Sequence, residues 1–222
     1  MNKKHWIMFS IGMSFLSLIF SILTYFGLIR YFNMYLFSSK SYANSYKTLE
    51  RANNDKVVIN ININPNKNYI SSAVINSLLD QTVRVDEINI FTDKPITLPE
   101  TNGIVKRHKT YKNYFSVMPC IMKETNKNTI IIFLNDNKIY GKDFIQDLID
   151  STDKDSSKKC AISCGLSKDK TIVTRSGIFD IDTTNMNIPK DYNTNDFINN
   201  YLSLKSIPIK NIDYNENYKA IF

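Results

Sequence analysis

One apolar stretch, TIIIFL at residues 129–134, constrains the fold of this chain more than any other segment. Its β-branched and aromatic residues favour an extended strand. A strand with one face in water would alternate polar and apolar residues, and this stretch does not alternate. It therefore predicts a strand covered on both faces, as in a parallel sheet with helices on each side.

The rest of the chain after residue 55 alternates strand and helix patterns. Such alternation indicates an α/β domain with a mostly parallel, Rossmann-like central sheet flanked by helices. Strands are predicted over 56–64, 86–91, 103–108 and 129–134, around Cys160 and Cys164, and over 171–181; helices are predicted over 68–81 (amphipathic), over 114–124 and after residue 138.

The strand at 129–134 ends on Asn135-Asp136-Asn137, one carboxylate between two amides. In parallel sheets, ligands bind beyond the carboxyl ends of the strands, and this triplet lies at that edge. Asn and Asp are also good turn formers, so a plain polar turn is the alternative. Asp143 follows at the start of the next helix, where a carboxylate stabilises the amino end.

The amino-terminal part contains an apolar run without charge, residues 6–29. Its length matches the roughly 30 Å hydrocarbon core of a bilayer and exceeds the apolar stretch of a cleaved signal peptide. It predicts one uncleaved transmembrane anchor after a short tail, residues 1–5. Residues 30–55 are interpreted as a polar stem without strong periodicity, and residues 56–222 as the α/β domain.

Composition narrows the class of partner. The net charge is +7, but the lysines are scattered, and no basic helix or arginine-rich stripe indicates a nucleic-acid partner. The three cysteines do not form a disulfide framework. A short basic cluster, residues 106–109, is interpreted as a solvated loop, with contact to a diphosphate as the alternative; His108 has no nameable catalytic partner.

Three segments together resemble the GT-A glycosyltransferases, in particular small family-2-like members. The resemblance covers roughly residues 56–209. Its most specific part is TIIIFLNDNKIYGKDFIQDLI (129–149), similar to the strand that ends in the family's acidic triplet. The other parts are SSAVINSLLDQTVRVDEINIFTD (71–93), similar to the opening helix and strand, and NTNDFINNYLSLKSIPI (193–209), similar to a later acidic pair that opens a helix.

The resemblance implies roles for individual residues. Asp136 would contact a metal ion or the nucleotide sugar, with Asn135, Asn137 and Asp93 beside the nucleotide. Asp196 would be the catalytic base or part of the pair that positions the acceptor. The implied cofactor is Mn²⁺ or Mg²⁺, which prefer oxygen ligands. The family usually has Asp-Asp-Asp or Asp-x-Asp where this chain has Asn135 and Asn137, so metal binding would be weakened by the missing charge.

Two functions follow from this pattern. The first is a membrane-anchored glycosyltransferase of hexosyltransferase type, moving a sugar from a nucleotide-sugar donor to a hydroxyl on a glycan, protein or lipid. The second is a catalytically inactive GT-A-like protein with a binding or structural role. The resemblance implies a signal-anchored single-pass protein with a lumenal or exterior domain, whereas the greater positive charge after the apolar run favours a cytoplasmic domain; both orientations stay open.

Overall fold

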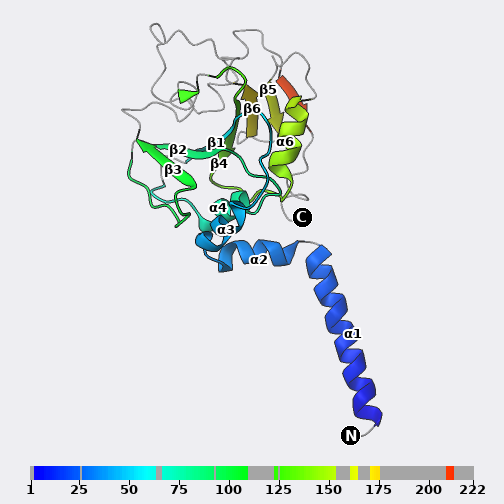
Figure 1. Cartoon of the computed structure of the whole chain (residues 1–222). Coiled ribbons are helices and arrows are strands. Elements are labelled where there is room, and N and C mark those ends of the chain that lie inside the picture. The colour runs from blue at the N-terminus through cyan, green and yellow to red at the C-terminus, as the bar shows by residue number, and fades with distance from the viewer. Residues whose placement is uncertain are drawn as a thin grey trace.

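The protein combines an α/β domain with an amino-terminal helix that projects away from it (Figure 1). The computed structural model describes residues 3–25, 27–63, 67–92, 94–109, 123–124, 126–153, 161–164, 171–175 and 209–212. The elements in chain order are α1 (Lys3–Tyr25), α2 (Leu28–Leu36), α3 (Ser39–Tyr46), β1 (Val57–Asn62), α4 (Ser72–Leu79), β2 (Glu87–Thr92), β3 (Val105–Lys109), β4 (Ile130–Asn135), α6 (Phe144–Asp153), β5 (Ala161–Cys164), β6 (Thr171–Arg175) and β7 (Ile209–Ile212).

The described strands form one sheet in the order β3-β2-β1-β4-β6-β5-β7. Strands β3, β2, β1 and β4 pair in parallel. Strand β6 pairs antiparallel with both β4 and β5, and β5 pairs in parallel with β7, so β6 alone runs against the others described. The predicted α/β class with a mostly parallel, Rossmann-like sheet is confirmed.

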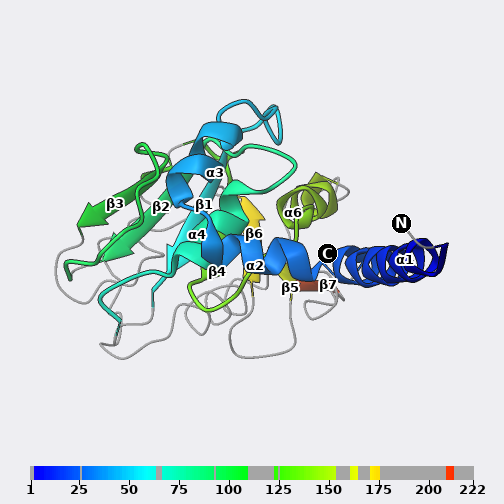
Figure 2. The same cartoon turned by 90° about the horizontal axis from the view of Figure 1, so that it is seen from below.

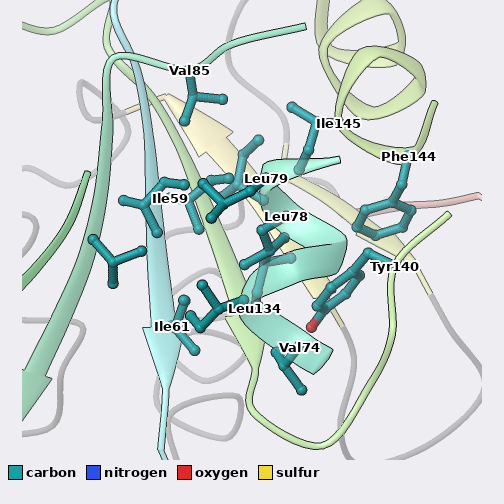
Figure 3. Close-up of a cluster of buried hydrophobic side chains, with 14 of the residues drawn as sticks. Ile59, Ile61, Val74, Leu78, Leu79, Val85, Leu134, Tyr140, Phe144 and Ile145 are labelled. Atoms are coloured by element: carbon teal, nitrogen blue, oxygen red, sulfur yellow. The ribbon is translucent and has the colours of Figure 1, made fainter. Parts of the chain in front are cut away.

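The central strand β4 is covered on both faces, as its sequence predicts. Ile130, Ile132 and Leu134 belong to the cluster shared with α4 and α6. Ile131 and Phe133 point to the opposite face and are equally buried. Figure 3 shows the first face, where Leu78 and Leu79 of α4 turn towards β1 and β4. Since no polar residue interrupts the strand, its first polar side chains appear only at its carboxyl end.

Helix α4 differs from the amphipathic helix predicted over 68–81. Every residue from Ala73 to Leu79 is buried, including Asn76 and Ser77. The reason is a second layer of helix, since α2 and α3 both pack on α4. The Asn76 side-chain amide donates to the carbonyl oxygens of Met34 (2.8 Å) and Phe37 (3.0 Å) at the end of α2. The covering layer thus provides acceptors for the Asn76 amide NH₂ group, which the sequence pattern of α4 does not reveal.

The segment interpreted as a stem without strong periodicity contains two short helices, α2 and α3. Only Met34 of α2, and Ser39, Ala43 and Tyr46 of α3, are buried in them. Because so few positions of these two helices are buried, their sequence shows no clear helical repeat of core residues. The Tyr46 hydroxyl accepts a hydrogen bond from the Val85 N–H at 2.8 Å, which fastens the end of α3 to the domain.

The apolar run predicted over 6–29 is divided between α1 and α2. In the described part of the chain, α1 is the one helix long and apolar enough to cross a membrane, and none of it is buried against the protein. Gly27 separates the two helices with a φ of 62°, a left-handed conformation that residues with a side chain rarely adopt. Figure 1 shows α2 turning away from the axis of α1 and running along the base of the domain.

Several predicted features lie outside the described residues. They are residues 114–122 of the predicted helix over 114–124, residues 176–181 of the last predicted strand, Cys120 and Cys160, and most of the segment 193–209. The strands expected near Cys164 and from residue 171 are present as β5 and β6.

Charged side chains form a network at the end of the sheet where β1 and β2 begin. Lys56 lies 2.9 Å from Glu87 and 3.0 Å from Glu124, and Lys123 also pairs with Glu87. Burial opposes ionisation of Glu87, but hydrogen bonds from Lys123 and Lys56 outweigh it and lower the pKa of this carboxyl from 4.5 to about 2. A lowered folded-state pKa stabilises the fold above pH 4.5, and that contribution is lost as the pH falls from 4.5 towards 2.

We predict that Glu87→Gln flattens the acid dependence of stability in this window. At pH 7 the variant should lose about 1 kcal/mol, because the network is partly solvent-screened. Urea unfolding of the full chain in detergent, repeated across pH 3–7, measures both effects. Glu100→Gln is the matched control, since Glu100 pairs with Lys40 on the surface and both are more than half exposed. A Glu87→Gln profile parallel to that of the unmodified chain would contradict this account.

We predict that Asn76→Ala loosens α2 from the domain. The change leaves the buried Met34 carbonyl and the part-buried Phe37 carbonyl without this donor, at a cost of about 1–3 kcal/mol. Limited proteolysis should then cut faster near residues 34–40, and the urea midpoint should fall. The exposed Asn54→Ala serves as control. Equal cleavage rates for both variants would show that Asn76 does not hold the layer.

Candidate functional site

The strand order reverses between β1 and β4. From β1 the chain passes through α4 to β2 and β3 on one side, and β4 then pairs with the other side of β1. The last paired residues of these neighbours are Asn62 and Asn135. Because the connections leave β1 and β4 in opposite directions, the carboxyl edge between them is the topological switch point, where open α/β sheets bind ligands.

The triplet that ends β4 lies at this point. Asn135 is half-buried, Asp136 is buried and Asn137 is exposed. Only 5% of Asp136 is accessible, so it is not the solvent-facing residue of a plain turn. Its Oδ2 lies 3.2 Å from the Lys67 Nζ, although no hydrogen bond of good geometry reaches that oxygen from the described residues. The lysine therefore supplies the charge compensation that a buried carboxylate requires.

Lys67 comes from the connection between β1 and α4. The neighbouring Asn68 carbonyl accepts a hydrogen bond from the Thr97 N–H at 2.8 Å, and the Ile70 N–H donates to the Thr97 carbonyl at 3.3 Å. These bonds tie the connection after β1 to the one after β2. Lys67 is one-third exposed, so its ammonium group bridges the buried Asp136 and the solvent at the edge of the sheet.

Tyr140 holds the turn that carries Asp136. Its hydroxyl accepts from the Asn135 N–H (2.9 Å) and donates to the Asn135 carbonyl (2.8 Å). The ring packs in the core beside Phe144, with centroids 5.0 Å apart (Figure 3). One buried side chain thus satisfies both backbone groups at the point where β4 ends, which fixes the direction in which the next residue leaves the strand.

Ser77 of α4 and Gln81, which follows α4, hold the connection between β4 and α6 from the other side. The Tyr140 N–H donates to the Ser77 Oγ at 3.1 Å. The Gln81 side chain donates to the Gly141 carbonyl at 2.7 Å and accepts from the Ile145 N–H at 3.1 Å. The sequence SLLDQ therefore supplies polar groups that position the link between β4 and α6. Asp143 lies at the start of α6, as predicted, and its carbonyl accepts the first helical bond, from the Asp147 N–H.

Arg30, just after the apolar run, reaches the same connection from α2. Its Nη1 donates to the Tyr140 carbonyl at 3.0 Å, and its Nε lies 2.7 Å from the Asp80 carboxylate. A cavity of about 530 Å³ opens here between the end of α1, α2, α3 and α4, away from Asp136. Arg30, Asp80 and Lys142 line it. This arginine connects α2 to the turn that carries the candidate site.

The donor set around Asp136 does not fit a tightly held divalent ion. Mg²⁺ and Mn²⁺ prefer several oxygen ligands, usually including more than one carboxylate. Here the single carboxylate is paired with an ammonium group, which repels a cation. No cluster of three or more His, Cys, Asp or Glu side chains occurs among the described residues.

The remaining predicted site residues are not brought together with Asp136 by the described structure. Asp93 and Asp196 lie outside the described residues. The basic cluster 106–109 is not a loop but most of the edge strand β3. Three strand spacings of about 4.8 Å separate β3 from β4 in the sheet. A contact from this cluster to a ligand held at Asp136 would therefore require the ligand to span about 14 Å.

His108 has structural partners. Its Nε2 lies 2.7 Å from the Asn89 Oδ1, and its ring stacks on Phe91 with centroids 4.8 Å apart. Burial and, next, the nearby positive charge of Lys123 lower the pKa of His108. These contacts anchor the edge strand to the sheet.

Sequence reasoning missed Lys67 and Tyr140. The signal for Lys67 was its place, directly after the first strand and Pro65, because the connection after the first strand of such a sheet borders the switch point. Tyr140 was visible only as part of the family-like motif, and its backbone contacts depend on the path of the turn.

Comparisons with known proteins add little to this geometry. No protein-family model and no curated protein matches the chain. Among solved structures, a CMP:2-keto-3-deoxy-manno-octonic acid synthetase complexed with CTP is similar, with a TM-score of 0.44 and 11% identity over 72% of this chain and 90% of that one. At this level the likeness carries no inference about activity.

We predict that Tyr140→Phe destabilises the protein by about 1–3 kcal/mol, because the Asn135 N–H and carbonyl lose their shared partner. Urea unfolding of the full chain in detergent measures the loss. Tyr69→Phe removes the same hydroxyl from a tyrosine that is 55% exposed and should change stability by less than about 0.5 kcal/mol. Equal effects of the two changes would refute the role assigned to Tyr140.

Proposed function

We propose that this protein is a membrane-anchored, glycosyltransferase-like protein that binds a nucleotide sugar at the carboxyl edge between β1 and β4. One observation carries the proposal: Asp136 is buried at the switch point and paired with Lys67. Burying a carboxylate is costly and a surface turn has no need of it. A site that must hold a buried acidic group beside a partly exposed cationic one explains the arrangement.

Each residue has a chemical task in this proposal. Lys67 offers its ammonium group to the diphosphate of the donor, where it provides charge neutralisation that a metal ion would otherwise supply. Asp136, released in part from Lys67, accepts a hydrogen bond from a ribose hydroxyl. Asn135 and Asn137 have amides that can both donate and accept hydrogen bonds towards the nucleotide. The donor set makes Mn²⁺ or Mg²⁺ at most a weak addition.

The transfer step rests on the resemblance to GT-A glycosyltransferases. Asp196 would take the proton from the acceptor hydroxyl, the acceptor oxygen would bond to the anomeric carbon, and the nucleoside diphosphate would leave with the electrons of the broken bond. Asp93 would contact the nucleotide. The acceptor would be a hydroxyl of a glycan, protein or lipid. Helix α1 would make this a single-pass, signal-anchored membrane protein, so that transfer would occur at a membrane.

A second function is favoured by the ion pair itself. Lys67 neutralises the charge of Asp136, and the two flanking asparagines carry no charge. The site therefore lacks the negative charge that would attract a metal ion. A protein with this site could bind a nucleotide sugar without turnover and act as a binding or structural partner. The two functions share the fold and the ligand and differ only in whether sugar is transferred.

Donor binding tests the shared part of the proposal. We expect the full chain in detergent to bind at least one UDP- or GDP-sugar in calorimetry, with an affinity that changes little when Mn²⁺ is removed. Lys67→Ala should weaken binding about tenfold or more, because a charge-assisted contact is lost. Lys127→Ala removes an exposed lysine from the turn before β4 and should leave binding unchanged. Absence of binding across the donor set would reject both functions.

Activity separates the two functions. Release of nucleoside diphosphate that depends on Asp196 and an acceptor would establish the transferase. Binding without release would establish the inactive protein. In that second case, Asn135→Asp together with Asn137→Asp should add a Mn²⁺-dependent gain in affinity.

A further inference from the structure

Helix α2 leaves an apolar, aromatic face uncovered. Phe32 is 58% exposed, Tyr35 is 56% exposed and Leu36 is 76% exposed, whereas Met34 on the other side is fully buried. The rings of Tyr31 and Tyr35 lie 5.2 Å apart along this exposed face. We call Tyr31, Phe32, Tyr35 and Leu36 the aromatic face of α2. Contiguous apolar surface of this kind marks a contact with another apolar body.

The position of α2 in the chain indicates that this apolar body is a lipid bilayer. Helix α1 has 23 residues and is therefore about 35 Å long, enough to cross the hydrocarbon core. It ends at Tyr25, and α2 begins at Leu28. The two residues between them span at most about 10 Å. If α1 crosses a bilayer, α2 must start at its surface.

The orientation of α2 about its own axis is fixed by the domain. The Arg30 guanidinium is bound to Asp80 and to the Tyr140 carbonyl, and the carbonyl of Met34 accepts from Asn76. These contacts come from the side of α2 opposite its aromatic face. Figure 1 shows α2 lying along the base of the domain at a steep angle to α1. The aromatic face cannot turn inward without breaking this attachment.

The surroundings of α2 suit a lipid headgroup layer. The cavity of about 530 Å³ is lined both by Thr24 and Gly27, at the end of α1, and by Arg30 and Lys142. Polar and basic side chains therefore lie at the level where α1 ends. Tyrosine and basic side chains are typical of the zone between water and hydrocarbon.

We infer that α2 is an in-plane membrane helix whose aromatic face is seated in the lipid surface. A helix of this type buries its apolar face roughly 5–10 Å into the boundary between headgroups and acyl chains. With α1 crossing the bilayer and α2 lying on it, the domain is held in one pose instead of swinging on a stem. The inference rests on the proposed anchoring by α1 and not on nucleotide binding.

Tryptophan quenching by brominated lipids tests this pose. The chain has one tryptophan, Trp6, so the double variant Trp6→Phe/Phe32→Trp reports on α2 alone. The full chain is reconstituted in phosphatidylcholine vesicles brominated either high or low on the acyl chains. We expect emission from position 32 to be lost to a degree comparable to Trp6, and more strongly with bromine near the headgroups.

Two controls separate the possible outcomes. Trp6→Phe/Lys106→Trp places the reporter on the exposed edge strand β3, which lies away from α1 and α2 in both views (Figures 1 and 2), and its emission should not change. Unmodified Trp6 reports whether α1 inserts. Quenching at Trp6 without quenching at position 32 would overturn the inference while leaving the anchor intact. Protection of position 32 from both lipid bromine and aqueous acrylamide would assign the face to a second copy of the chain and also overturn it. No quenching at Trp6 would remove the anchor and the inference together.

Discussion

The parallel pairing of β1 with β4 is the contact on which the rest of the structure depends. It runs in register from Val57 opposite Ile130 to Asn62 opposite Asn135. Because both strands are buried along their length, polar side chains needed for binding can emerge only where the strands end. The register brings these ends level, so that the connection after β1 and the turn after β4 share one edge. Lys67 and Asp136 meet for this reason.

Buried hydrogen bonds then fix the path of the backbone after β4 at that edge. Tyr140 hydrogen-bonds both backbone groups of Asn135. Ser77 of α4 and Gln81, which follows α4, hold the residues that come next. The side of this hydrogen-bonded turn away from Asp136 contacts Arg30 in α2. Packed and hydrogen-bonded groups thus link α2 to the candidate site. Helices α2 and α3, which follow the apolar helix α1, therefore pack on the domain that carries this site.

The ion pair between Lys67 and Asp136 changes the chemistry expected of the site. A carboxylate pair or triplet would attract a divalent ion, whereas one carboxylate neutralised by an ammonium group would not. The same ammonium group can meet a diphosphate directly. The arrangement is consistent with binding of a charged donor in which protein cations, and not a metal ion, compensate the phosphate charge. Turnover then depends on an acidic group elsewhere, for which Asp196 is the proposed residue.

The sequence by itself determined the class of fold, the strand that ends at Asp136 and the apolar amino-terminal helix. These are local properties, because an unbroken apolar run and the spacing of hydrophobic residues are readable without knowing their neighbours. Only the tertiary structure decided that α4 is buried on all sides, that residues 28–46 form a covering layer, and that Lys67 compensates Asp136. Each of these depends on contacts between segments far apart in the chain, as Asn76 with Met34 or Arg30 with Tyr140. Local sequence patterns do not encode such pairs, since the same polar side chains would suit a solvent-exposed surface equally well.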